Sequence, residues 1–199
     1  MNLPNKLTIL RVILIPFFML FILLPDFSGI NRTVSDIVAA AIFGIASYTD
    51  YLDGHIARKQ NIVTNFGKFM DPIADKLMVF GAFLCFMVSQ AISPLYRYIF
   101  AIIVFVVLLR EFAVTSVRLV AQSSGGKVIA ANMAGKIKTC SQIAFILLAL
   151  LERHIFCFSD FFAEYLPLTC ASCIIMLVFT IISGATYIIP NISYLDPNK

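Results

Sequence analysis

Four aspartates supply the clearest candidate chemistry in this chain of 199 residues. They lie in the pattern Asp50-x-x-Asp53-Gly54-x-x-Ala57-Arg58, followed after eight residues by Gly67-x-x-x-Asp71-x-x-x-Asp75. On helices, residues three or four apart share a face, so each aspartate pair would present two carboxylates to one side. Carboxylates that meet across a gap between two helices repel one another unless cations lie among them. The spacing therefore predicts a cation site between two helices.

The residues around the aspartates favour a phosphorylated ligand. Gly54 and Ala57 are three apart and would leave a helix face with little side chain, on which a nucleotide can approach the backbone. Arg58 adds a planar donor for phosphate. The alternative is that the two small residues make a helix contact and that Arg58 is a topological charge at the membrane surface.

The composition indicates an integral membrane protein. Hydrophobic residues make up 60% of the chain, charged residues only 13%, and the mean hydropathy is +0.93. Each apolar stretch is about long enough to cross roughly 30 Å of hydrocarbon. The stretches lie near 7–24, 33–50, 69–90, 96–119, 136–152 and 167–190. We expect an all-α protein with six transmembrane helices, forming a single domain over 1–199.

The distribution of basic residues predicts the orientation in the membrane. With six spans, one side carries eleven lysines and arginines and the other side three, and Arg110 lies within a span. The eleven are Lys6, Arg11, Arg58, Lys59, Lys68, Lys76, Arg118, Lys127, Lys136, Lys138 and Lys199. Such an excess marks the cytoplasmic side. Both termini and the aspartates would then face the cytoplasm, and the net charge of +4 fits anionic lipids or substrates better than nucleic acid.

A second group of charged residues lies in the later part of the chain. Arg110 and Arg118 are eight apart and would lie on a similar face of one helix, with Lys136 and Lys138 opening the next helix. Arg110 is inside an apolar stretch, where an unpaired guanidinium is costly. Glu111 would point about 100° away along the helix and is expected to be a poor partner. We expect a carboxylate of another helix or a substrate phosphate to pair with Arg110. For the other three cations, a purely topological role is the alternative.

The aspartate pattern resembles the signature of the CDP-alcohol phosphotransferase family, and every defining position is present. The resemblance implies displacement of CMP from a CDP-linked alcohol by a hydroxyl group. It implies that Asp50, Asp53, Asp71 and Asp75 bind two divalent ions, Mg²⁺ or Mn²⁺, on the pyrophosphate. It makes Asp75 the general base, with a metal-held water as the alternative. It also implies nucleotide contacts from Gly54, Ala57, Arg58 and Gly67.

Three further stretches resemble the bacterial phosphatidylglycerophosphate synthase branch of that family. They begin at Asn2-Leu3-Pro4-Asn5, at Leu109-Arg110-Glu111-Phe112 and at Gly135-Lys136-Ile137-Lys138. This similarity implies that CDP-diacylglycerol and sn-glycerol 3-phosphate give phosphatidylglycerol phosphate and CMP. Arg110, Arg118, Lys136 and Lys138 would bind the acceptor phosphate. Asn5, Thr8 and Arg11 would hold the nucleotide end, although a capped helix entrance explains these three equally well.

The same similarity implies a homodimer. With the apolar stretches and the charge count, we expect a multi-pass protein of the bacterial cytoplasmic (inner) membrane whose active site faces the cytoplasm and whose donor substrate is a membrane lipid. Two other functions stay open. Another enzyme of the family would use inositol phosphate, phosphatidylglycerol or serine as the acceptor. An ion carrier would also place carboxylates in the membrane, but carriers usually bind near the midplane and not at the helix ends.

Overall fold

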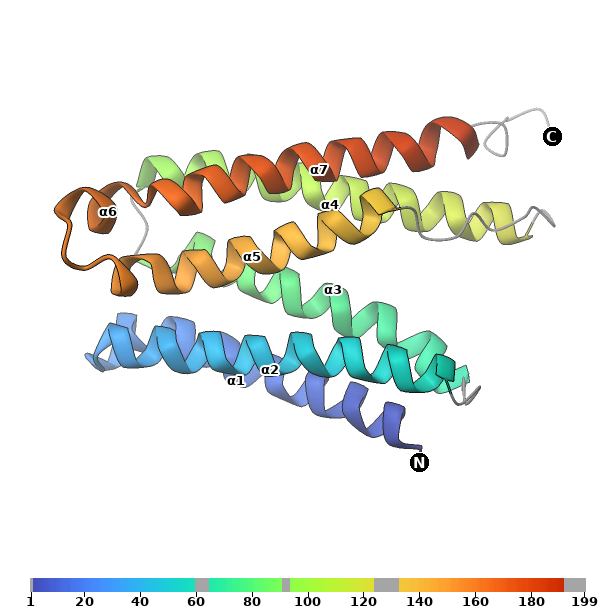
Figure 1. Cartoon of the computed structure of the whole chain (residues 1–199), viewed down its shortest axis with the longest axis horizontal. Helices are drawn as coiled ribbons and strands as arrows, with labels where there is room; N and C mark the ends of the chain where they lie inside the picture. The colour runs from blue at the N-terminus through green and yellow to red at the C-terminus, as the bar shows by residue number, and fades with distance from the viewer. Residues whose placement is uncertain (1, 60–64, 91–93, 124–132, 192–199) are drawn as a thin grey trace. The chain divides into compact units, whose positions relative to one another are not determined.

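The computed structural model describes residues 2–59, 65–90, 94–123 and 133–191, which are helical almost throughout (Figure 1). These residues contain no β-strand, as expected of an all-α protein. The helices are α1 (Leu3–Ser28), α2 (Arg32–Lys59), α3 (Asn65–Val88), α4 (Pro94–Ser123), α5 (Met133–Ile155), α6 (Asp160–Tyr165) and α7 (Pro167–Asn191).

The ends of α1 follow from residues that favour helix boundaries. Pro4 lies in the first turn, where its missing N–H leaves no intrahelical hydrogen bond unmade. Gly29 follows the last turn with φ of 66°, a left-handed conformation that glycine adopts without the Cβ strain of other residues. Between these ends, α1 runs for 26 residues, long enough to span a bilayer.

Among the described residues, four helices are long and apolar enough to cross a membrane, which supports a multi-pass membrane protein. These spans are Pro4–Ser28, Pro94–Ala121, Met133–Ile155 and Pro167–Asn191. The helices α2 and α3 are similar in length, but α2 is less apolar, and the first half of α3 carries charged residues that include Asp71, Asp75 and Lys76. The expected six spans are therefore matched by four helices, and membrane crossing by α2 and α3 stays a prediction.

The chain divides into two compact units, and each can be described by itself. The first unit comprises Met1–Arg97 and Ile146–Leu166, and the second comprises Tyr98–Phe145 and Pro167–Lys199. Both α4 and α5 contribute residues to each unit. This division concerns contacts and not independent folding, so the single domain over 1–199 stays a prediction.

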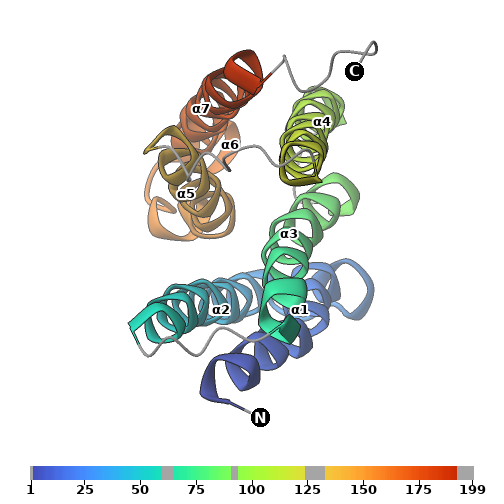
Figure 2. The same cartoon turned by 90° about the vertical axis from the view of Figure 1, so that its right-hand side faces the viewer.

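In the first unit, α1 packs against both α2 and α3 (Figure 2). One stripe of α1 is buried, with residues three and four apart: Thr8, Arg11, Ile15, Phe18 and Ile22. The Phe18 ring lies 5.4 Å from the Phe43 ring of α2. On the α3 side, a Cβ at Gly81 would lie 3.1 Å from Met19 Sδ, so the glycine permits close packing of α1 on α3.

The end of the first unit that is remote from the motif has its own polar contacts. Asp26 of α1 pairs with Arg32 of α2. His154 Nε2, on the part of α5 that belongs to this unit, lies 2.8 Å from Asp36 Oδ2. The aromatic residues that follow α5 cluster with those of α6, and Phe156 stacks on Phe162 at 4.9 Å. The contact of His154 with Asp36 joins the α5–α6 segment to α2.

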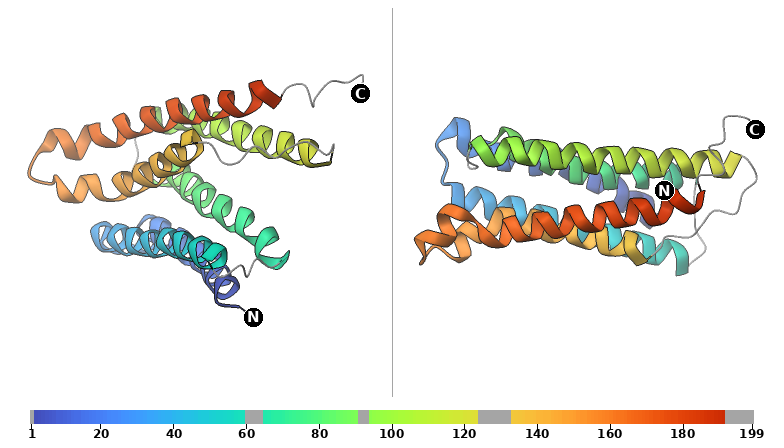
Figure 3. Two further views of the ribbon diagram at one scale, coloured as in Figure 1. Left: turned by 45° about the vertical axis from the view of Figure 1, so that its right-hand side comes forward. Right: turned by 90° about the horizontal axis from the view of Figure 1, so that it is seen from above.

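In the second unit, α4 and α7 run side by side in the same direction (Figure 3). Val114 and Val117 of α4 pack against Tyr187 of α7. Phe100 of α4 and Phe145 of α5 place their rings 5.3 Å apart. This unit also buries a few polar side chains, which include Glu111, Lys138 and Gln142.

Candidate active site

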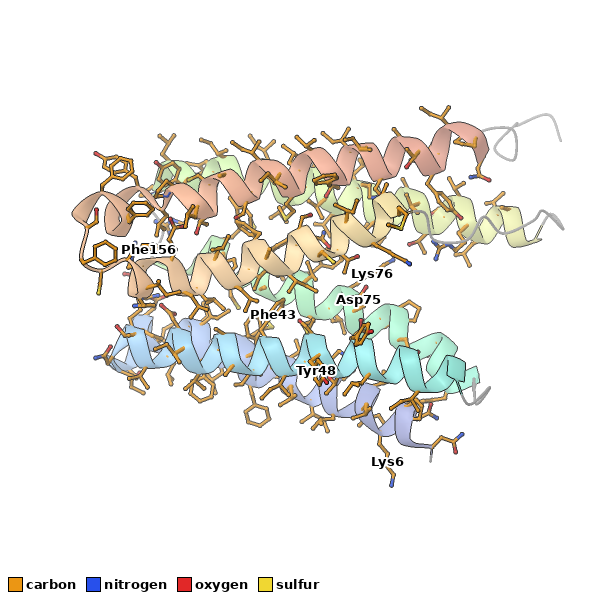
Figure 4. All side chains as sticks on the ribbon, viewed as in Figure 1. Lys6, Phe43, Tyr48, Asp75, Lys76 and Phe156 are labelled. Atoms are coloured by element: carbon orange, nitrogen blue, oxygen red, sulfur yellow. The ribbon has the colours of Figure 1, made fainter. Side chains whose placement is uncertain are left out.

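The motif aspartates lie near the ends of α2 and α3 that the segment 60–64 connects. Asp50 is in the second half of α2, while Asp71 and Asp75 are in the first turns of α3, where Figure 4 labels Asp75 and Lys76. The side chains of Asp50, Asp71 and Asp75 are half-buried. The side chain of Asp53 lies outside the described part of the structure, although its backbone belongs to α2.

The first turns of α1 bring two buried polar side chains to these aspartates. Arg11 Nη1 lies 2.5 Å from Asp50 Oδ1, and the arginine side chain is 0% exposed. Thr8 Oγ1 lies 2.8 Å from Asp71 Oδ1 and 3.1 Å from its own helix carbonyl, Pro4 O. The single hydroxyl proton of Thr8 is thus shared between these two acceptors. One face of α1 therefore touches aspartates of both α2 and α3.

The donor set fits a hard divalent cation by its chemistry. Carboxylate oxygens are the ligands that Mg²⁺ and Mn²⁺ prefer, and each carboxylate has several acceptor positions. Asp50 and Asp71 each engage one oxygen with α1, which leaves the other oxygen of each for a cation. Among the described side chains, which exclude Asp53, no three His, Cys, Asp or Glu converge on one point. The metal assignment therefore stays a prediction that includes Asp53.

The other residues predicted to contact the nucleotide are described in part. Gly67 is buried at the start of α3, and Gly54 is half-buried in α2. The side chains of Ala57 and Arg58 lie outside the described part. Asn5 is half-buried in the first turn of α1, while Lys6 beside it is exposed and points away from the helix (Figure 4). Nucleotide binding by this group stays a prediction.

A second charged cluster lies in the second unit. Glu111 Oε1 accepts hydrogen bonds from Arg110 Nη1 at 2.8 Å and from Lys138 Nζ at 2.6 Å. The expectation that Glu111 is a poor partner for Arg110 was wrong. A long arginine side chain can fold over its neighbour in spite of the 100° between them, and Lys138 of α5 draws the same carboxylate to that side. We call Arg110, Glu111 and Lys138 the cationic cluster, because two positive groups share one carboxylate.

Two small residues of α7, which the sequence analysis missed, complete the surroundings of Arg110. Ser183 Oγ accepts a hydrogen bond of 2.5 Å from Arg110 Nη2. A Cβ at Gly184 would lie only 3.0 Å from Arg110 Cγ, so the glycine lets the arginine lie against the helix. The available signal was a Ser-Gly pair within an apolar helix, which is weak by itself.

Two buried donors of this unit have no hydrogen-bond partner among the described residues. They are Arg110 Nε and Gln142 Nε2. Gln142 lies one helical turn beyond Lys138 on α5, so the two side chains share a face. Unpaired buried donors are costly, and an anionic or hydroxylated ligand would satisfy them. The arrangement suits an acceptor that carries a phosphate.

The two remaining predicted cations differ in their surroundings. Arg118 Nε lies 3.4 Å from Tyr187 Oη, and the guanidinium lies 5.4 Å from the centre of the Tyr187 ring. Arg110 and Arg118 therefore both face α7, which confirms the expected shared face of α4. Lys136 is exposed at the start of α5.

Comparison with known proteins assigns the chain to a family. The family model described as CDP-alcohol phosphatidyltransferase matches residues 1–187. A CDP-diacylglycerol–glycerol-3-phosphate 3-phosphatidyltransferase of Bacillus subtilis is 42% identical, over 96% of this chain and 95% of its own. A protein of the same name from Haemophilus influenzae is 38% identical over 71% of each chain. A probable phosphatidylglycerophosphate synthase of Mycobacterium tuberculosis is 34% identical, over 94% of this chain and 80% of its own. This chain belongs to the CDP-alcohol phosphatidyltransferase family.

Proposed function

We propose that the protein transfers the phosphatidyl group of CDP-diacylglycerol to sn-glycerol 3-phosphate, giving phosphatidylglycerol phosphate and CMP. The observation that carries the proposal is the 42% identity, over nearly the full length of both chains, to an enzyme named for this reaction. The complete aspartate pattern and the cationic cluster agree with it. The protein is thus an enzyme of phospholipid biosynthesis.

The aspartates would bind the donor substrate, CDP-diacylglycerol. Divalent metal use is general in the family, and the proposal places two ions, Mg²⁺ or Mn²⁺, at Asp50, Asp53, Asp71 and Asp75. When bound, such ions neutralise the charge that develops on the pyrophosphate oxygens. Arg58 and the small residues Gly54, Ala57 and Gly67 would contact the cytidine diphosphate group, as would Asn5.

The chemical step needs one proton acceptor. A hydroxyl oxygen of glycerol 3-phosphate forms a bond to the phosphorus that carries diacylglycerol. The bond from that phosphorus to the bridging oxygen breaks, and CMP leaves with the electron pair. We assign the hydroxyl proton to a carboxylate oxygen of Asp75, one helical turn beyond Asp71 and half-buried.

The cationic residues would bind the phosphate of the acceptor. Glu111 neutralises one of the two charges on Arg110 and Lys138, so the cluster keeps a positive excess that a phosphate can balance. Arg118 and the exposed Lys136 would add electrostatic attraction for the same phosphate. A neutral acceptor such as serine would leave that excess uncompensated, which favours a phosphorylated acceptor.

The lipid product and substrate explain a membrane location. We propose that α2 and α3 also cross the bilayer, that the site faces the cytoplasm of a bacterial inner membrane, and that the protein is a homodimer. The positive-inside count of the sequence supports the orientation.

The test is CMP release by the purified protein from CDP-diacylglycerol with Mg²⁺. Acceptors to compare are glycerol 3-phosphate, glycerol, serine, inositol phosphate and phosphatidylglycerol. We expect release to require glycerol 3-phosphate. Release that requires another acceptor would agree with the assignment of CDP-diacylglycerol as the donor, but it would contradict glycerol 3-phosphate as the acceptor. If no acceptor supports CMP release, the proposed enzyme activity is wrong and an ion carrier is favoured.

A further inference from the structure

The buried stripe of α1 contains an arginine where its period calls for an apolar side chain. From Ile22 the stripe runs back through Phe18 and Ile15 to Arg11 and then Thr8, and each of the five is at most 7% exposed. An arginine in such a position is strongly destabilising unless a carboxylate compensates it. One compensating carboxylate is that of Asp50 of α2, at 2.5 Å.

Thr8 extends the same face of α1 to the other helix of the motif. It is 1% exposed, and its hydroxyl lies 2.8 Å from Asp71 Oδ1 of α3. Thr8 and Arg11 are three residues apart, so they act from one turn of a rigid helix. That turn touches one aspartate on each side of the predicted cation site.

We propose that Thr8 and Arg11 are positioning residues, which hold Asp71 and Asp50 in the orientation that a divalent cation requires. The inference rests on the proposed function, because it takes these aspartates to be metal ligands. Groups that orient metal ligands commonly change metal affinity about 10-fold to 100-fold when they are removed. Each contact engages one carboxylate oxygen and leaves the other for a cation. One face of α1 would thereby fix the orientation of a carboxylate on α2 and of another on α3.

This role differs from binding of the nucleotide by Thr8. A hydroxyl that contacts the nucleotide acts on the affinity for CDP-diacylglycerol. A hydroxyl that orients Asp71 acts on the cation, even when no nucleotide is bound. Cation binding without substrate therefore separates the two roles.

The experiment measures binding of Mn²⁺ alone to the purified full chain, by electron paramagnetic resonance. We expect Thr8→Val, which keeps the shape and removes the hydroxyl, to weaken Mn²⁺ binding by about 10-fold or more. Thr8→Ser retains the hydroxyl and should retain the affinity. Arg11→Lys keeps the charge but loses the planar donors, and it should also weaken binding.

A matched control is Thr180→Val, because Thr180 is 0% exposed and its hydroxyl bonds within its own helix, to Met176 O at 2.7 Å. It should bind Mn²⁺ like the unaltered protein. Unchanged Mn²⁺ affinity in Thr8→Val would overturn the inference, above all if its KM for CDP-diacylglycerol rose instead. If the unaltered protein releases CMP but binds no Mn²⁺, the inference fails and the proposed reaction stands. If it does neither, the proposed function itself fails.

Discussion

The aspartate group of the first unit and the cationic cluster of the second are built in opposite ways from similar parts. In the first, carboxylates predominate and a buried arginine, Arg11, compensates Asp50. In the second, cations predominate and one carboxylate, Glu111, joins Arg110 and Lys138. Each group includes a residue of opposite charge that pairs with its neighbours but does not cancel the formal charge of the group. The aspartate group therefore keeps a negative excess that suits a cation, and the cationic cluster keeps a positive excess that suits an anion.

The negative charge of the aspartate group and the positive charge of the cationic cluster suit the two substrates in different ways. Carboxylates bind the CDP-diacylglycerol pyrophosphate only through cations, since both carry negative charge. Guanidinium and ammonium groups are suited to bind the phosphate of glycerol 3-phosphate directly, without a cation between them. Variants of the first group should therefore abolish turnover, and variants of the second should act on the acceptor KM.

The largest effect is expected for Asp71→Asn. A metal ligand contributes several kcal/mol to stabilisation of the transition state, so CMP release should fall by on the order of 1,000-fold. The control Asp26→Asn makes the same change at the other end of α1, where Asp26 pairs with Arg32. It should leave CMP release nearly unchanged. Full activity of Asp71→Asn would show that Asp71 is not an essential metal ligand.

A smaller and more selective effect is expected for Arg110→Gln. Loss of a charged hydrogen bond to phosphate should raise the KM for glycerol 3-phosphate by about 30-fold to 100-fold, which is about 2–3 kcal/mol. Glu111 keeps Lys138 as its partner at 2.6 Å, so the variant should fold. An equal rise in the KM for CDP-diacylglycerol would contradict the assignment of the aspartate group to the donor and of the cationic cluster to the acceptor.

Gly184→Ala tests the support of Arg110 without altering a charge. The added Cβ would lie 3.0 Å from Arg110 Cγ, so the arginine must shift. A loss of roughly 1 kcal/mol in the hydrogen bonds of Arg110 would raise the acceptor KM about 5-fold. At Gly44 an added Cβ would meet nothing within 4 Å, so Gly44→Ala is the control. Equal acceptor KM values for the two variants would show that Gly184 does not position Arg110.

The smallest effect is expected for Lys136→Gln. Lys136 is exposed, and single exposed charges contribute up to about 1 kcal/mol, which screening by salt reduces further. The acceptor KM should rise less than about 5-fold, and the rise should shrink as the salt concentration increases. A rise as large as that of Arg110→Gln, independent of salt, would place Lys136 in direct contact with the acceptor phosphate.

Much of this protein could be predicted because the relevant signals are local. Apolar stretches predicted the helices, and the spacing of the aspartates predicted the family that the comparisons then established. The shared face of Arg110 and Arg118 on α4 also followed from helical periodicity, whereas its contact with α7 is a finding of the structure. The family resemblance indicated Thr8 and Arg11 for the nucleotide end, and periodicity alone would also have indicated them, since both continue the buried stripe of α1.

The sequence by itself determined which residues carry charge within apolar helices, and their spacing along each helix. The partners of those charges were decided by tertiary structure. Only the packing of α5 on α4 brings Lys138 to Glu111, which turned an expected poor partner into the centre of a cluster. Only the packing of α1 between its neighbours gives Asp50 and Asp71 their contacts. The physical reason is that a buried charge is stabilised by groups near in space, and helix packing brings together residues that are far apart in the chain.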